Sequence, residues 1–178
     1  MKKQAFTLVE LMVSISIVGI LSIGILNLYG NGIQNREILN IFLNKIVGRI
    51  ETVKNNSLVG KGIGTNLETP KYYKVIFSTG NYMRTYYNTG GVDILFNSLS
   101  INPFENFYTI KSIECKKTDL SNITTSNLIT LTYKGTDISL TGCNNNYQKI
   151  IDLKFDYKGM ESTIRLNTIS GVLEKINN

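Results

Sequence analysis

The sequence predicts an α+β fold, in which one long N-terminal helix is followed by antiparallel strands. Three observations lead to this prediction. An uncharged apolar run opens the chain, apolar residues then recur with helical spacing, and the segments after Pro70 alternate apolar and polar residues between turns. Neither an internal repeat nor a linker divides the rest of the chain, so we expect one globular, β-rich domain at residues 55–178.

The predicted helix covers residues 6–54 and has two halves. The first half contains a candidate transmembrane segment at about residues 11–29, because roughly 20 apolar residues cross a hydrocarbon core about 30 Å thick. The sequence has no charged residue between Glu10 and Arg36. The second half is predicted to pack on the globular domain, since its apolar residues follow helical spacing: Leu39, Phe42, Ile46, Ile50 and Val53.

Strands are predicted where aromatic and β-branched residues alternate with polar ones. Turns are expected at Gly80 with Asn81, at Gly135 and at Gly159, and such short connections favour antiparallel pairing. The predicted strands lie at residues 71–79, 82–87, 107–115, 128–134, 137–141, 149–157, 162–169 and 172–175. We interpret the tyrosines of the first two strands as packing residues rather than as a stacking surface for bases: Tyr72, Tyr73, Tyr86 and Tyr87.

The charges that flank the apolar run predict its orientation. Lys2 and Lys3 precede the run. By the positive-inside rule, the N-terminus is cytoplasmic and the C-terminal domain is periplasmic or extracellular, with a single pass through the inner (cytoplasmic) membrane. A cleaved secretory signal peptide is not favoured, because no small-x-small cleavage site follows the run.

The carboxylate of Glu10 stands where the apolar run begins. A buried carboxylate needs a partner, and acidic residues at membrane spans are therefore functional candidates. The residues by themselves leave open whether Glu10 pairs with a cation or is solvated among the lipid headgroups.

The segment KKQAFTLVELMVSISIVGILSIG resembles the N-terminal signal of type IV pilins and type II secretion pseudopilins. The resemblance implies a leader of residues 1–5, cleavage by a prepilin peptidase between Ala5 and Phe6, N-methylation of Phe6, and assembly through Phe6 and Glu10. The implied cut would create an ammonium on Phe6, four residues before Glu10, with an ordinary pKa of about 8. This ammonium could pair with Glu10 within one helix or between two subunits, and the sequence leaves both arrangements open. Before the cut the family usually has Gly, where this chain has Ala5. The resemblance also implies a pilin fold, in which the amphipathic half of the helix lies across an antiparallel sheet. The ending STIRLNTISGVLEK is similar to that of H-type (FimT-like) minor pseudopilins.

The same resemblance implies a structural subunit, minor pseudopilin or minor pilin, of a secretion pseudopilus, a type IV pilus or a competence fibre. Its expected partners are other pilin or pseudopilin subunits, the prepilin peptidase, an inner-membrane assembly platform and the platform's ATPase. Two alternatives stay open: a pilus subunit that itself binds DNA or a surface ligand, and a membrane-anchored protein without an assembly role. Nucleic-acid binding is not indicated, because the positive residues are scattered along the chain.

The composition gives little support to catalysis, and we predict that the protein is not an enzyme. The chain has no His, which excludes Ser-His and Cys-His nucleophile pairs and histidine metal sites. We predict no catalytic residue, cofactor or metal site. The acidic residues of the second half do not form an oxygen-ligand loop: Asp137, Asp152, Asp156, Glu161 and Glu174.

Cys115 and Cys143 are the only cysteines of the chain, and both belong to the part predicted to lie outside the cytoplasm. An oxidising compartment favours a disulfide between them over two buried thiols. On the chain-entropy model, closing this loop would stabilise the fold by roughly 3 to 4 kcal/mol.

Overall fold

The computed structural model describes residues 8–63, 67–101, 108–117, 123–144 and 149–177, without the side chains of residues 23–32. The chain divides into two units, Met1–Ile38 and Leu39–Asn178. The elements of the described residues are α1 (Leu8–Val59), β1 (Tyr72–Ser78), β2 (Tyr82–Thr89), β3 (Val92–Leu95), a short 3₁₀ helix η1 (Asn97–Leu99), β4 (Tyr108–Lys116), β5 (Ile123–Ser126), β6 (Leu128–Lys134), β7 (Asp137–Thr141), β8 (Ile150–Tyr157), β9 (Met160–Asn167) and β10 (Val172–Asn177). The predicted α+β class is confirmed.

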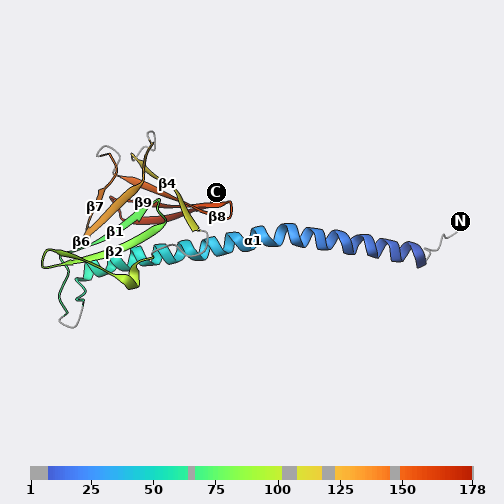
Figure 1. Cartoon of the computed structure of the whole chain (residues 1–178), viewed down its shortest axis with the longest axis horizontal. Helices are drawn as coiled ribbons and strands as arrows, with labels where there is room; N and C mark the ends of the chain where they lie inside the picture. The colour runs from blue at the N-terminus through green and yellow to red at the C-terminus, as the bar shows by residue number, and fades with distance from the viewer. Residues whose placement is uncertain (1–7, 64–66, 102–107, 118–122, 145–148, 178) are drawn as a thin grey trace. The chain divides into compact units, whose positions relative to one another are not determined.

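The strands form two five-stranded antiparallel sheets (Figure 1). The first sheet has the order β3-β2-β1-β6-β7, and the second sheet has the order β10-β9-β8-β4-β5. Every hairpin that the turns predicted is present, but the division into two sheets depends on long-range pairs. Strand β1 pairs with β6, and β4 pairs with β8 instead of continuing the first sheet.

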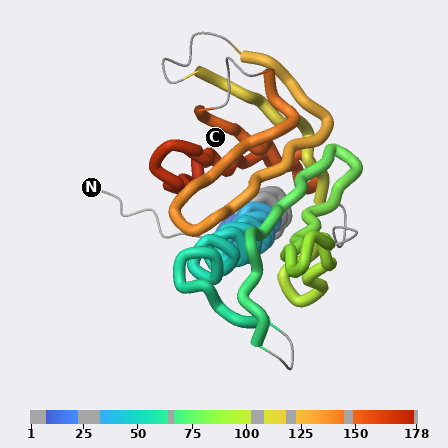
Figure 2. Tube along the Cα trace, turned by 90° about the vertical axis from the view of Figure 1, so that its left-hand side faces the viewer, coloured from blue at the N-terminus to red at the C-terminus, as the bar shows by residue number. Residues whose placement is uncertain are grey.

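The second half of α1 packs on the sheets through the residues that the helical spacing predicted. The five predicted residues Leu39, Phe42, Ile46, Ile50 and Val53 are all buried, and so is Leu43, which was not among them. The Phe42 ring stacks on Tyr108 of β4, with 3.9 Å between ring centroids, and meets Phe155 of β8 edge-on at 6.0 Å. Near the end of the helix, the Ser57 hydroxyl donates to the Gly135 carbonyl of the β6–β7 turn at 3.4 Å. Figure 2 shows this part of the helix (cyan) beside the β6–β7 hairpin (orange).

The helix ends at Val59, five residues later than the sequence predicted. Gly60 has a φ of +60°, and the Lys61 N–H donates to the Asn56 carbonyl at 3.1 Å. This is the Schellman arrangement that closes a helix at a glycine, and it caps carbonyls that would otherwise lack donors. The apolar spacing stops at Val53, so periodicity alone ended the predicted helix too early.

Two short strands, β3 and β5, were not predicted. Strand β3 pairs with β2 through a two-residue loop of Gly90 and Gly91, which have φ values of +62° and +95°. A Gly-Gly pair is a known signal for such a tight hairpin, because both positions need positive φ. All four residues of β3 are exposed, so the strand lacks the half-buried alternation on which strand prediction depends.

Candidate functional site

The candidate processing residues Lys2, Lys3, Ala5 and Phe6 lie outside the described part of the structure, which begins at Leu8. Their predicted roles in cleavage and methylation therefore stay predictions. Glu10, the remaining residue of the proposed assembly pair, is described. It lies in the first turn of α1 and its side chain is exposed. A carboxylate is favoured there because it faces the positive end of the helix dipole.

The part of the first unit from Leu8 to Leu21 exposes large apolar side chains on successive turns of the helix. The large apolar residues from Leu8 to Leu21 are between 52% and 76% exposed. Its serines are internally satisfied: Ser14 donates to the Glu10 carbonyl at 2.8 Å, and Ser16 and Ser22 donate to the carbonyls four residues before them. Such an apolar surface needs lipid or partner helices to cover it.

The predicted transmembrane segment at residues 11–29 extends into residues 23–32, whose side chains are outside the described part. Among the residues that the structure describes, none of the helical stretches is both long and apolar enough to cross a membrane.

The predicted disulfide is confirmed. Cys115 and Cys143 are bonded, and their Cα atoms are 6.0 Å apart. Cys115 belongs to β4 of the second sheet, whereas Cys143 lies two residues after the end of β7 of the first sheet. The bond therefore ties the two sheets together, which the sequence could not show.

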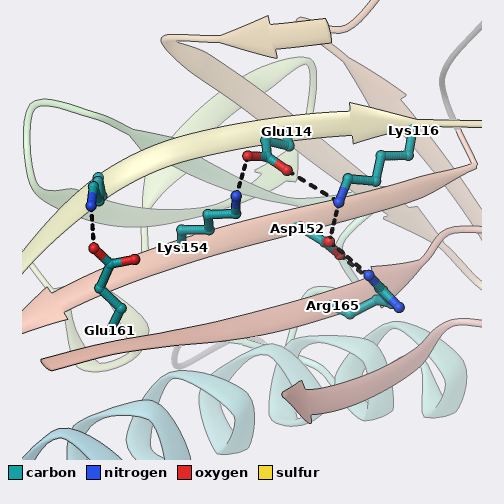
Figure 3. Close-up of polar contacts among 7 residues, drawn as sticks. Glu114, Lys116, Asp152, Lys154, Glu161 and Arg165 are labelled. Carbon is teal, nitrogen blue, oxygen red and sulfur yellow. Dashed lines mark hydrogen bonds and ion pairs between the residues drawn. The ribbon is translucent and has the colours of Figure 1, made fainter. Parts of the chain in front are cut away.

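A charged network that the sequence did not predict crosses the centre of the second sheet (Figure 3). We call it the β4–β8–β9 network; its members are Glu114, Lys116, Asp152, Lys154 and Arg165. Asp152 lies opposite Glu114 on one side and Arg165 on the other in the strand register. It accepts hydrogen bonds from Nε and Nη2 of Arg165, both at 2.8 Å, and from Nζ of Lys116 at 2.7 Å. Its side chain is only 3% exposed.

Glu114 completes the network. Its two carboxylate oxygens face Lys116, at 3.1 Å, and Lys154. Burial alone would raise the pKa of Asp152 and of Glu114, but hydrogen bonds from the surrounding cations outweigh it and lower both pKa values. For Lys116, burial acts to lower the pKa, and the two carboxylates raise it above its ordinary value. Asp152, Glu114 and Lys116 therefore hold one another in their charged forms, and their ion pairs connect β4 to β8.

A pattern in the sequence could have indicated part of this network. Charged residues alternate with buried apolar ones in β8, where Asp152, Lys154 and Asp156 share one face. That this face of β8 lies beside Arg165 and Glu114 could not be predicted from the sequence, because it depends on the register of three strands.

Comparison with known proteins identifies the N-terminal segment. Residues 1–26 match the family described as the prokaryotic N-terminal methylation motif. The chain carries the type IV pilin and pseudopilin signal. This motif implies a membrane-anchored subunit that a prepilin peptidase processes and that assembles with other pilin subunits. Neither a curated protein nor a solved structure was found to be significantly similar to the chain.

Proposed function

We propose that the chain is a structural subunit, a minor pseudopilin or minor pilin, of a type II secretion pseudopilus, a type IV pilus or a competence fibre. The methylation motif at residues 1–26 is the observation that carries the proposal. In this proposal, a prepilin peptidase cuts between Ala5 and Phe6 and methylates Phe6. An inner-membrane platform and its ATPase then move the subunit into the fibre, with the N-terminus cytoplasmic and the C-terminal domain outside before assembly.

The proposed assembly contact joins the Phe6 ammonium of an incoming subunit to Glu10 of a subunit already placed. The exposure of Glu10 in the first turn of α1 supports it, because a neighbouring chain can reach this carboxylate. The apolar surface from Leu8 to Leu21 supports it too, since helix packing in the fibre would cover side chains that the first unit leaves exposed. A contact between the Phe6 ammonium and Glu10 would also fix the register between subunits.

Two sequence features favour a minor pseudopilin within this class. The C-terminal STIRLNTISGVLEK is similar to the end of H-type subunits, and the chain has no proline between Phe6 and Lys54, where many major pilins have one.

Intact-mass analysis of the membrane protein tests the processing step. We expect a chain that lacks residues 1–5 and carries one added methyl group on Phe6. A chain that keeps its leader and an unmodified Phe6 would contradict the proposal.

Assembly is tested with Glu10→Gln, which removes the charge and keeps the side-chain shape. We expect this variant to be cleaved normally but to be depleted from the sheared fibre fraction. Glu37→Gln is the matched control, because Glu37 is also an exposed carboxylate of α1. Equal incorporation of the Glu10→Gln and Glu37→Gln variants would remove the proposed role of Glu10.

A further inference from the structure

The face of the first sheet opposite its buried side carries an aromatic and cationic strip on β2. Met83 and Thr85 are buried, whereas Tyr82, Arg84 and Tyr86 alternate with them and are half-buried on the other face. In the strand register, Ile76 of β1 lies opposite Arg84, and Leu95 of β3, which is 40% exposed, lies opposite Tyr86. We call these five residues the Tyr-Arg face. The structure therefore corrects the interpretation of the strand tyrosines as a single packing group: Tyr73 is in the core, and Tyr86 is not.

Arg84 is the unusual member of this face. Its guanidinium lies over the Tyr82 ring, with Cζ 4.4 Å from the ring centroid. Its Nε–H is inaccessible to solvent and donates to no acceptor among the residues that the structure describes. Among the described residues, no carboxylate is within ion-pair distance of Arg84. A half-buried guanidinium normally has an anionic partner, because burial without one is unfavourable.

The other cation of this surface differs, because it already has a partner. Lys74 lies opposite Tyr86 and pairs with Asp93 at 2.5 Å. Asp93 also accepts hydrogen bonds from the Tyr72 hydroxyl and from the Asn88 amide, both at 2.8 Å. The hydrogen bond with Asp93 is the main cause of the raised pKa of Lys74. Lys74 is thus already neutralised by Asp93, whereas Arg84 has no carboxylate partner among the described residues and can bind an anion from another molecule.

One unpaired cation flanked by two tyrosines matches a protein partner better than a nucleic acid. Strong nucleic-acid binding neutralises several phosphates, each with its own cation. Protein interfaces instead concentrate their binding energy in a few Tyr and Arg residues surrounded by apolar contacts, which Ile76 and Leu95 provide here. The fork of a guanidinium fits the two oxygens of a carboxylate.

We propose that the Tyr-Arg face binds a neighbouring pilin-like subunit that presents an Asp or Glu carboxylate to Arg84, with apolar side chains against Tyr82 and Tyr86. This inference rests on the proposed function, because it places the chain in a fibre with other subunits. It adds a contact made by the globular domain to the one made by the N-terminal helix.

Site-specific photocrosslinking of the full-length chain in its producing cells tests the inference. The variant Tyr86→p-benzoylphenylalanine is irradiated, and the sheared fibre fraction is analysed by mass spectrometry. We expect an adduct to another chain that carries an N-terminal methylation motif, at a peptide that contains Asp or Glu. Adding Arg84→Gln should lower the adduct yield per fibre subunit roughly tenfold, the change expected for loss of one charge-assisted contact.

Lys111→Gln is the matched control, because Lys111 is an exposed cation of the second sheet that pairs with Glu161. It should leave the adduct yield unchanged. Arg84→Lys keeps the positive charge but lacks the planar guanidinium, so we expect an adduct yield between those of the wild type and Arg84→Gln. If the Arg84→Gln chain does not accumulate in the cells, the yield of the Arg84→Lys variant tests the inference in its place.

Equal yields with and without Arg84→Gln would overturn the inference, and so would an adduct to nucleic acid alone or a processed, fibre-associated chain without any adduct. A chain that keeps its leader and never enters the fibre fraction would instead overturn the proposed function, and the inference with it.

Discussion

Replacing Asp152 by Asn should destabilise the globular domain strongly, because Asp152 is the central carboxylate of the β4–β8–β9 network. The change keeps the side-chain shape but removes the negative charge that Arg165 and Lys116 share. Breaking a buried ion pair on one side costs about 3–5 kcal/mol, since a buried charge is left without its partner. Here Lys116 keeps Glu114 at 3.1 Å and Arg165 is 26% exposed, so we expect a loss near the lower limit, about 3 kcal/mol. That is a large part of the roughly 5–15 kcal/mol by which domains are stable.

Urea unfolding of the full-length protein in detergent micelles measures this loss. The chain has no Trp, so near-ultraviolet circular dichroism of its tyrosines is the appropriate signal. The matched control is Asp156→Asn, on the same face of β8, where the carboxylate accepts a long hydrogen bond of 3.5 Å from the Gly159 N–H and, among the described residues, has no cation within ion-pair distance. The control should change the free energy of unfolding by no more than about 0.5 kcal/mol. A loss below about 1 kcal/mol for Asp152→Asn, or equal losses for both variants, would refute the reasoning about the network.

The same network predicts how stability depends on pH. The folded-state pKa values of Asp152 and Glu114 are lowered relative to the unfolded chain, so the unfolded state binds more protons as the solution becomes acidic. The stabilisation is complete above the unfolded pKa values, about 4, and is lost as the pH falls through the lowered folded values. Asp152→Asn should weaken this acid dependence. An identical slope of stability against pH below about 4 in both proteins would show that Asp152 does not contribute.

Two further substitutions test other parts of the globular domain. Tyr133→Phe should be neutral or stabilising by up to about 1 kcal/mol, because the buried Tyr133 hydroxyl has no hydrogen-bond partner within the described part of the chain. Burial also raises the pKa of this hydroxyl. A clear loss of stability in a urea melt would contradict this reasoning. The double change Cys115→Ser with Cys143→Ser should lower stability by roughly 3 kcal/mol, since it releases the tie between the two sheets. Dithiothreitol should not lower the stability of the double variant further. A double variant with the same melting temperature as the wild type would contradict the predicted role of the disulfide.

Most secondary structure could be predicted from the sequence, because it depends on local patterns. The strands β6 and β7 have the predicted bounds, Leu128–Lys134 and Asp137–Thr141. Their aromatic and β-branched residues alternate, and a glycine turn separates them. Strand β3 was missed because its side chains are exposed throughout, so burial imposes no alternation on its sequence.

The candidate sites divide in the same way. The methylation motif is a contiguous segment, and a chain with two cysteines has only one intramolecular pairing, so both could be predicted. The surroundings of Asp152 could not be predicted, because its ionic partners are distant in sequence. The position of Arg84 away from every described carboxylate could not be predicted either, because it depends on which strands lie beside β2. Asp152 lies 13 residues from Arg165, and Lys116 is 36 residues from Asp152.

Local sequence was thus sufficient to specify a processed N-terminal helix, its buried stripe from Leu39 to Val53, and most strands of a disulfide-bonded β-rich domain. The tertiary fold set the neighbours of each strand, and through them the two sheets, the network around Asp152 and the unpaired guanidinium of Arg84. The physical reason is that a strand offers similar backbone donors and acceptors on both edges. Its partners are therefore selected by side-chain burial and register over the whole domain.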